Sequence, residues 1–224
     1  MDAFMAGLNM NSLGAALIGY GLGSVPFGLV LTRLAGLGDI RQIGSGNIGA
    51  TNVLRTGNKF LAFMTVICDS GKGGAAAWLA WNLFGFESGL IAGFMAVLGH
   101  NFPIWLKFKG GKGFATTLGV LLVTSWPIGV AAGATWLLLA GMFRYSSLAA
   151  LGALAAAPVY AEYLATRPVT IMAAGLAILG IARHHENIIR LMRGEESKIG
   201  GTKKTAENIP EDTEKDAGDD SKGH

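Results

Sequence analysis

Apolar residues in this chain are gathered into long continuous runs, and polar, glycine-rich segments separate them. The runs are Leu13–Leu31, Phe60–Phe86, Ser88–Trp105, Phe114–Phe143, Leu148–Tyr163 and Val169–Ala182. A helix needs about 20 apolar residues to cross the hydrocarbon core of a bilayer. Backbone polar groups in lipid must be satisfied within the segment itself, so such runs form helices. The pattern predicts an all-α polytopic membrane protein.

The run Phe114–Phe143 decides the number of spans, because it is long and contains Pro127 near its middle. A turn at Ser125–Pro127 divides it into two short helices and gives seven spans. Lys and Arg favour cytoplasmic loops, and seven spans place Arg144 and the basic stretch after Ala182 in the cytoplasm. We therefore expect about seven transmembrane helices, with the N-terminus outside and the C-terminus cytoplasmic. Five spans, with some segments crossing incompletely, are the alternative.

Charge divides the chain into a membrane body and a tail. Of the 33 charged residues, 14 lie in Glu195–His224, whose net charge is −4, whereas the preceding residues carry +7 and 30 of the 34 glycines. Because a soluble domain has about 25% charged residues, the sparse body excludes an ordinary soluble enzyme. We expect a membrane-embedded domain at residues 1–199 and a disordered acidic cytoplasmic tail at 200–224. The basic body favours a small anionic ligand or lipid head groups over nucleic acid.

The segment Gly44–Asn52 is the first of three that carry candidate chemistry. Its glycines let consecutive backbone N–H groups face one anion, and the planar guanidinium of Arg55 suits a phosphate. The residues expected to bind phosphate here are Arg41, Ser45, Gly46, Asn47, Gly49, Thr51, Asn52 and Arg55. The letters GSGNIG also match the dinucleotide-binding fingerprint, but that motif requires a preceding strand. A membrane helix precedes it here, which excludes dinucleotide binding.

The second segment runs from Gly99 to Gly113 and ends in Gly-Gly-Lys-Gly. It is not a Walker loop, because no Ser or Thr follows Lys112 and the glycine spacing differs. Lys112 is still well placed to meet a phosphate over a glycine backbone. The candidate residues in this segment are His100, Asn101, Gly110, Gly111, Lys112 and Gly113.

The third segment, His184–Lys198, directly follows the last apolar run. His184 and Asn187 are three positions apart, so they share one helix face and can donate to a phosphate or a hydroxyl. Three further residues are candidates for substrate binding or for ion pairs that brace the loops: Arg190, Glu196 and Lys198. Ser147, shortly after Arg144, reaches the same membrane face in the seven-span arrangement.

Asp69 and Lys72 lie inside the second apolar run, where charged residues are functional by default. The alternative is a mutual ion pair that breaks the helix at Gly71–Gly74. Some familiar motifs are absent: no His has an Asp five positions later, no G-x-S-x-G elbow occurs, and no His or Cys spacing suggests a metal. The single Cys68 excludes a disulfide. The sequence therefore supports no hydrolase triad, metal or other cofactor.

The letters SGNIGATNVLR, GHNFPIWLKFKGGKG and HHENIIRLMRGEESK, in this order among spans, resemble the three motifs of the bacterial acyl-phosphate:glycerol-3-phosphate acyltransferases. The resemblance covers about residues 13–199. Arg144 and Ser147 are similar to a short Arg-x-x-Ser element of that family. The sequence departs from the family pattern at Ala150, where a second serine is expected.

The resemblance implies an enzyme of the bacterial plasma (inner) membrane whose active site faces the cytoplasm. Such enzymes transfer a fatty acyl group from acyl phosphate to the 1-hydroxyl of glycerol 3-phosphate. The products are lysophosphatidic acid and phosphate, in the first acylation of phospholipid synthesis. No cofactor is implied. The expected partners are acyl phosphate, glycerol 3-phosphate, membrane lipids and the soluble enzyme that makes acyl phosphate.

Six residues are expected to be catalytic: Ser45, Arg55, Lys112, Ser147, His184 and Asn187. Acyl phosphate is an activated donor, so the enzyme needs positioning and charge stabilisation more than a strong base. This agrees with the missing base dyad. One alternative function is a transporter of a phosphorylated small metabolite, because transporters often contain broken helices and intramembrane charges. The other is a lipid-binding structural subunit.

Overall fold

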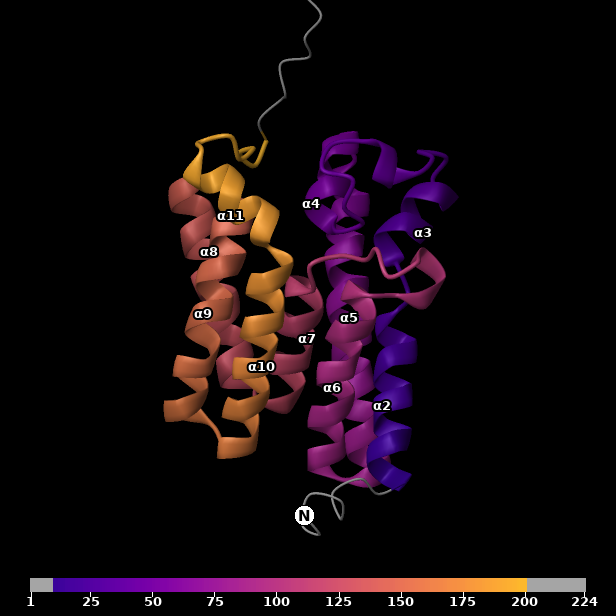
Figure 1. Cartoon of the computed structure of the whole chain (residues 1–224), viewed down its shortest axis with the longest axis vertical. Coiled ribbons are helices and arrows are strands. Elements are labelled where there is room, and N and C mark those ends of the chain that lie inside the picture. The colour runs from indigo at the N-terminus through magenta and orange to yellow at the C-terminus, as the bar shows by residue number, and fades with distance from the viewer. Residues whose placement is uncertain (1–9, 201–224) are drawn as a thin grey trace, which may run out of the picture.

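The computed structural model describes residues 10–200, and within that range it contains helices and no strand (Figure 1). The all-α prediction is therefore confirmed, while the predicted tail beyond Gly200 lies outside the described residues. The α-helices are α2 (Met10–Gly23), α3 (Phe27–Leu34), α4 (Ala50–Val53), α5 (Lys59–Phe84), α6 (Phe86–Asn101), α7 (Phe114–Thr124), α8 (Trp126–Phe143), α9 (Ser146–Leu164), α10 (Arg167–Arg183) and α11 (His185–Met192). Short 3-10 turns are η1 (Ile40–Gln42), η2 (Leu54–Thr56) and η3 (Ile104–Leu106).

Four of these segments are long and apolar enough to cross a membrane, by length and composition: Met10–Leu34, Phe86–Leu106, Trp126–Phe143 and Ser146–Leu164. The shorter α7 is also apolar. The predicted division of the long run is present, because α7 ends at Thr124 and Ser125 has an extended backbone with φ −160°. Pro127 then lies in the first turn of α8, where its missing N–H removes no helical hydrogen bond.

Two other expectations about the helices require revision. The first apolar run is interrupted between α2 and α3, since Pro26 disfavours helical backbone at the residue before it. The expected ion pair between Asp69 and Lys72 is present, but the expected break of the helix at Gly71–Gly74 is wrong, because α5 is continuous from Lys59 to Phe84. Added Cβ atoms at Gly73 and Gly74 would press on the backbone of α7, so these glycines permit close helix packing.

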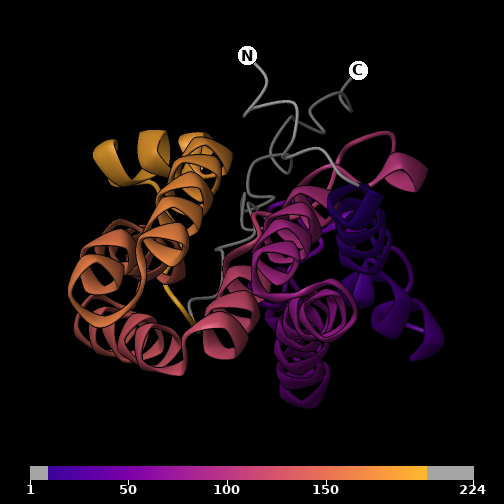
Figure 2. The ribbon, with the colours of Figure 1, turned by 90° about the horizontal axis from the view of Figure 1, so that it is seen from below.

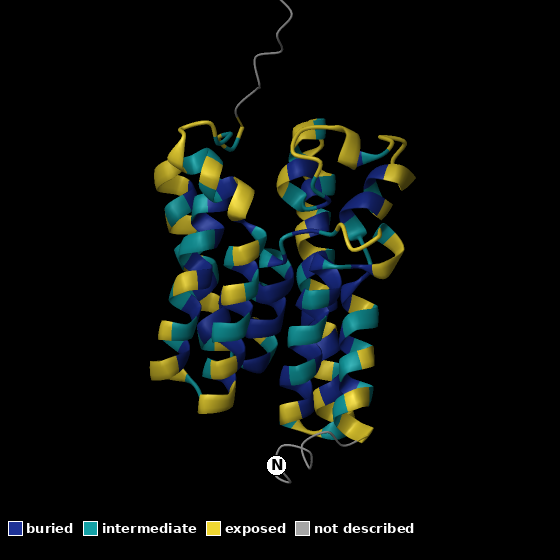
Figure 3. Cartoon of the chain, viewed as in Figure 1, coloured by how far each residue is buried: buried dark blue, intermediate teal, exposed yellow. Residues whose placement is uncertain are grey.

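The helices form two groups joined by α7. One group contains α2, α5 and α6, the other contains α8, α9 and α10, and α7 lies between them in both views (Figures 1 and 2). The main hydrophobic core links the groups: Val97 of α6, Val120 of α7, Ile128 of α8 and Leu176 of α10 belong to one cluster and are almost fully buried. Figure 3 shows the buried positions on the helix faces that turn toward one another.

The polar segments meet at one end of the molecule. Successive long helices alternate in direction, so α4 and α11 lie toward the upper end in Figure 1, and the loop between α6 and α7 lies below them, closer to the middle of the molecule. The turns between α5 and α6, α7 and α8, and α9 and α10 lie toward the other end. All three candidate segments are thereby brought to the end where the two helix groups face each other.

Candidate active site

A cavity of about 500 Å³ lies among the three candidate segments, between the two helix groups. All six residues expected to be catalytic line it: Ser45, Arg55, Lys112, Ser147, His184 and Asn187. Eight of the other candidates line it as well: Asn47, Gly49, Thr51, Asn52, His100, Gly113, Arg190 and Glu196. Residues more than one hundred positions apart in the sequence therefore line one pocket.

Asn52 organises the first segment. Its side-chain Nδ2 donates to the carbonyl oxygens of Ile40, Ile43 and Asn47 at 2.9, 3.1 and 2.8 Å, and its Oδ1 accepts the Ser45 N–H at 3.0 Å. Gly44 has a positive φ of 58°, a conformation that glycine adopts without strain. Because Asn52 is almost fully buried and its amide is engaged, its role is to shape the loop around Ser45.

Two contacts connect the first segment to the second helix group. Thr51 Oγ1 and Ser146 Oγ are 3.0 Å apart and share a hydrogen bond. Arg55 Nη2 donates to Ser197 Oγ at 2.5 Å. Ser146 and Ser197 also line the cavity, although they are not among the residues predicted from the sequence. Each is adjacent to a predicted residue, and this adjacency is the signal that the sequence contains.

Lys112 is the cation of the second segment that reaches into the cavity. Its Nζ donates a hydrogen bond to Oδ1 of Asn187. Burial lowers the pKa of Lys112 to about 8, and the positive charge of Arg190 acts in the same direction. The next residue, Gly113, has φ 85°, which allows the chain to turn directly into α7. Lys112 is therefore a desolvated cation available to an anionic ligand.

His184 lies between α10 and α11 and is almost fully buried. Its Nδ1 is 2.7 Å from the carbonyl oxygen of Gly180, and a carbonyl can only accept, so Nδ1 carries a proton. Burial lowers the pKa of His184 to about 4. The ring is therefore neutral near pH 7, and its Nε2 is a hydrogen-bond acceptor. By contrast, the neighbouring His185 is exposed.

Glu196 connects three side chains at the edge of the cavity. Its Oε1 accepts from Ser147 Oγ at 2.9 Å and from Asn187 Nδ2 at 2.7 Å, and its Oε2 accepts from Arg190 Nε at 2.7 Å. Burial alone would raise the pKa of Glu196, but the hydrogen bonds from Arg190, Asn187 and Ser147 lower it below its ordinary value. The expected bracing by an ion pair is thus present between Arg190 and Glu196.

Six expected binding residues do not line the cavity: Arg41, Gly46, Asn101, Gly110, Gly111 and Lys198. Arg41 instead forms an ion pair with Asp39 at 2.5 Å, and hydrogen bonds from its side chain hold the pKa of Asp39 far below its usual range. The ammonium of Lys198 lies 5.7 Å from the centre of the Tyr145 ring. Gly110 and Gly111 are fixed behind Lys112, where their carbonyl oxygens accept hydrogen bonds from Arg183.

The cavity also has an apolar wall, whose residues are not predicted from the sequence. Val66, Phe114, Leu118 and Trp136 contribute to it. An isolated apolar side chain in a membrane helix gives no signal that it faces a ligand, because most such residues face lipid or core. The combination of polar donors and an apolar wall suits a ligand that has both a charged and an apolar part.

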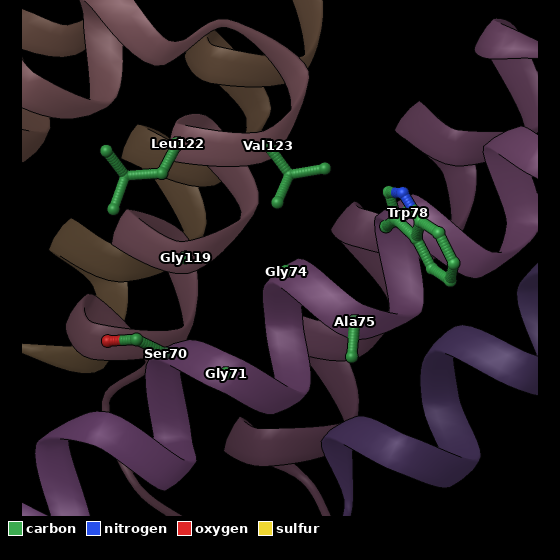
Figure 4. A pocket seen from close by; sticks show the side chains of 8 residues that line it. All are labelled: Ser70, Gly71, Gly74, Ala75, Trp78, Gly119, Leu122 and Val123. Atoms are coloured by element: carbon green, nitrogen blue, oxygen red, sulfur yellow. The ribbon is translucent and has the colours of Figure 1, made fainter.

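An apolar groove of about 400 Å³ adjoins this wall on α5 and α7 (Figure 4). It is lined by Ser70, Gly71, Gly74, Ala75, Trp78, Gly119, Leu122 and Val123. Helix residues four positions apart share a face, so Ser70 follows Val66 along α5, and Leu122 follows Leu118 along α7. The groove therefore continues the apolar wall of the cavity away from its polar end.

Known proteins resemble this chain over most of its length. A family model described as glycerol-3-phosphate acyltransferase matches residues 13–194. The glycerol-3-phosphate acyltransferase of Paramagnetospirillum magneticum is 66% identical over 191 residues, which are 85% of this chain and 95% of the relative. That of Rhodospirillum rubrum is 65% identical over 199 residues, which cover 85% of this chain and 92% of the relative.

Solved structures agree with the sequence relatives. The crystal structure of PlsY (YgiH), an integral membrane glycerol 3-phosphate acyltransferase, in its glycerol 3-phosphate form has a TM-score of 0.78 and 37% identity, covering 84% of this chain and 94% of that chain. The lysophosphatidic acid form gives a TM-score of 0.77 and 36% identity with the same coverage. The chain is a membrane protein and an acyltransferase, and it belongs to the glycerol-3-phosphate acyltransferase family.

Proposed function

We propose that the protein transfers a fatty acyl group from acyl phosphate to the 1-hydroxyl of glycerol 3-phosphate, giving lysophosphatidic acid and phosphate. The observation that carries the proposal is the cavity, where phosphate donors from three segments face an apolar wall that continues into a groove. Both substrates have a phosphate, and the donor also has an acyl chain. The groove on α5 and α7 accommodates that chain.

The first segment and Ser147 hold the phosphate of the donor. The hydroxyl of Ser45 and the side-chain amide of Asn47 line the cavity and supply neutral donors. The backbone N–H groups of Ser45, Gly46 and Gly49 already donate within the segment. Ser147 Oγ approaches from α9. These donors stabilise the negative charge that develops on the leaving phosphate.

Glycerol 3-phosphate binds beside Lys112 and the third segment, which Arg55 reaches through Ser197. Arg55 and Lys112 are the cations for its phosphate, and Arg pairs well with phosphate because of its planar fork. Neutral His184 accepts a hydrogen bond from a glycerol hydroxyl through Nε2, and Asn187 orients both Lys112 and the substrate. This arrangement holds the 1-hydroxyl against the acyl carbon. For an activated donor, such positioning is the principal source of rate enhancement.

The acyl transfer is direct. The 1-hydroxyl oxygen forms an ester bond to the acyl carbon, the bond from that carbon to the phosphate oxygen breaks, and the hydroxyl proton passes to the departing phosphate. A histidine with a pKa of about 4 is a weak base, which supports the donor phosphate as the proton acceptor. A covalent acyl-Ser45 intermediate is the rival route. Rapid quench followed by mass spectrometry of the intact protein separates them, since an acylated protein species would contradict direct transfer.

In the membrane, we propose seven spans, with the N-terminus outside and the cavity facing the cytoplasm of a bacterial inner membrane. The basic residues near the polar end support this orientation, because Lys and Arg favour cytoplasmic loops. A cytoplasmic cavity receives both soluble glycerol 3-phosphate and acyl phosphate from a soluble partner enzyme. Labelling of single cysteines at positions 144 and 167 tests the arrangement: access to the first from the cytoplasm and to the second from outside is expected.

One assay tests the reaction. Purified protein in lipid nanodiscs is mixed with acyl phosphate and labelled glycerol 3-phosphate, and we expect labelled lysophosphatidic acid together with released phosphate. Acyl-CoA in place of acyl phosphate is the donor control. Uptake of glycerol 3-phosphate into vesicles without acylation would instead identify the transporter alternative.

A further inference from the structure

Three ionisable side chains form a buried cluster beside the cavity. Asp69 and Lys72 come from α5 and His100 from α6, and each is at most 6% exposed. Lys72 Nζ lies 2.6 Å from Asp69 Oδ1. Buried charges are costly unless they are paired and hydrogen-bonded, and charged residues inside membrane helices usually serve a function. Asp69 and His100 line the cavity, whereas Lys72 lies behind them.

Lys72 has a hydrogen-bond partner for each of its three N–H groups. Besides Asp69, its Nζ contacts the carbonyl oxygen of Val25 at 2.7 Å and Nδ1 of His100 at 2.8 Å. An ammonium group donates three hydrogen bonds and accepts none. Nδ1 of His100 therefore accepts, and the proton of the neutral ring is on Nε2. Asp69 Oδ1 is 3.6 Å from the same Nδ1, beyond hydrogen-bond distance.

The opposite edge of the His100 ring faces the glycine loop that holds Lys112. An added Cβ at Gly111 would overlap the ring at Nε2. The backbone N–H of Gly111 also donates to the carbonyl oxygen of His100 at 3.0 Å. His100 thus contacts the residue that immediately precedes Lys112. A change in the orientation of the ring would therefore change the position of the Lys112 backbone.

We propose that Lys72 is a positioning residue, which holds His100 as a neutral Nε2–H donor at the cavity and so sets the binding of glycerol 3-phosphate beside Lys112. Lys72 also donates to the carbonyl oxygen of Val25, which lies in the interruption between α2 and α3, so this segment is connected to the cluster. The inference rests on the proposed function only for the identity of the bound phosphate.

The two cavity histidines then have opposite hydrogen-bonding roles. The Nδ1–H of His184 donates a hydrogen bond to the carbonyl oxygen of Gly180, which leaves Nε2 as an acceptor. His100 accepts at Nδ1 and therefore donates at Nε2. A donor suits the anionic phosphate of the substrate, whereas an acceptor suits its hydroxyl. Because the protonation of each ring is fixed by a buried partner, the cavity keeps both roles without a histidine that becomes charged.

The first experiment measures the tautomers directly. The full chain, labelled with ¹⁵N-histidine and placed in nanodiscs, is studied by NMR at pH 7, and resonances are assigned with His100→Gln and His184→Gln variants. We expect His100 as the neutral Nε2–H form and His184 as the neutral Nδ1–H form. An Nδ1–H or doubly protonated His100 would overturn the proposal. No turnover is needed, so this result is independent of whether the proposed reaction occurs.

The second experiment separates positioning from general stability. The double variant Lys72→Met/Asp69→Asn removes both buried charges together and leaves no unpaired one. We expect the KM for glycerol 3-phosphate to rise about tenfold or more, as for a lost hydrogen bond to a charged group, with the KM for acyl phosphate unchanged. Unchanged KM for glycerol 3-phosphate, or a fall in kcat alone, contradicts the proposal.

The matched control is Lys59→Met, because Lys59 is an exposed lysine at the start of the same helix. This variant should keep the wild-type KM for both substrates. If the double variant does not fold, Lys72→Arg replaces it. Arg retains the charge and the donors, so the Nε2–H form of His100 should persist in that variant, and its loss would contradict the proposal.

Discussion

Lys112 Nζ donates a hydrogen bond to Oδ1 of Asn187, and this contact joins the second and third segments across 75 positions of sequence. The amide of Asn187 donates in turn to Glu196, which also accepts from Ser147. One chain of hydrogen bonds therefore runs from the glycine loop to the start of α9. Because Lys112 is a half-buried cation in this chain of hydrogen bonds, its protonation should control the binding of glycerol 3-phosphate.

The pH dependence of the reaction follows from Lys112. Its pKa is about 8, so the ammonium is present below pH 8 and is lost as the pH rises above it. We expect kcat/KM for glycerol 3-phosphate to fall about tenfold for each pH unit above 8, since this ratio reports the free enzyme. Steady-state rates between pH 6 and 10 measure the effect.

The control for that profile is Lys112→Arg. A guanidinium stays charged throughout this pH range, so the alkaline fall should disappear even where the overall activity is lower. An alkaline fall of the same shape in Lys112→Arg would show that another group is titrating.

Glu196 is the second point at which the hydrogen-bonded chain can be broken. Glu196→Ala leaves the side chains of Arg190, Asn187 and Ser147 without their shared acceptor. We expect kcat/KM to fall about 10- to 100-fold and the midpoint of thermal unfolding to fall as well. Glu196→Gln retains an acceptor and should lose less on both measures. Equal losses in the two variants would contradict a hydrogen-bonding role.

Much of this site could be predicted from sequence, and the reasons for the exceptions are physical. The six catalytic candidates converge because each belongs to a polar segment at the same end of an alternating helix bundle. Arg41 was expected to bind phosphate, but Asp39 lies two positions away and pairs with it. Neighbouring charges in a loop can satisfy each other, and spacing alone does not reveal which of them remains free.

Other features depended on tertiary contacts that no local pattern encodes. The glycines of α5 look like a helix-breaking segment, yet packing against α7 keeps the helix continuous. The ring orientation of His100 depends on Lys72, 28 positions earlier. Trp136 reaches the cavity from an apolar run that otherwise resembles any membrane helix. Such placements depend on how the helices cross in the folded protein, and the sequence of a single segment does not predict that crossing.

Ser45 tests the proposed phosphate site. In Ser45→Ala the longer contact from Ser45 Oγ to Asn52 Oδ1, 3.3 Å, is lost with the hydroxyl donor. The shorter bond from the backbone N–H to the same oxygen remains, so the loop should keep its shape. We expect kcat/KM to fall about 10- to 100-fold, the cost of one hydrogen bond to a charged group. Rates near those of the wild type would contradict the placement of Ser45 beside the donor phosphate.

The groove on α5 and α7 makes a prediction about acyl-chain length. From Ser70 to Trp78 the helix rises by about 12 Å, and Trp78 lies at the far end of the groove. An added Cβ at Gly71 would meet nothing within 4 Å, so Gly71→Leu fills the groove without disturbing the backbone. We expect this variant to prefer shorter acyl phosphates, and Trp78→Ala to accept longer ones. Competition between acyl phosphates of different length measures the preference.

Gly141→Leu is the matched control for that experiment. Gly141 is an exposed glycine of α8 that also has nothing within 4 Å of an added Cβ, and it does not line the groove. The same change there adds equal bulk and equal helix propensity in the membrane region, so the chain-length preference should remain that of the wild type. A shift of equal size in both variants would show that added bulk on a membrane helix, rather than filling of the groove, alters selectivity. An unchanged preference in Gly71→Leu would place the acyl chain elsewhere along the cavity wall.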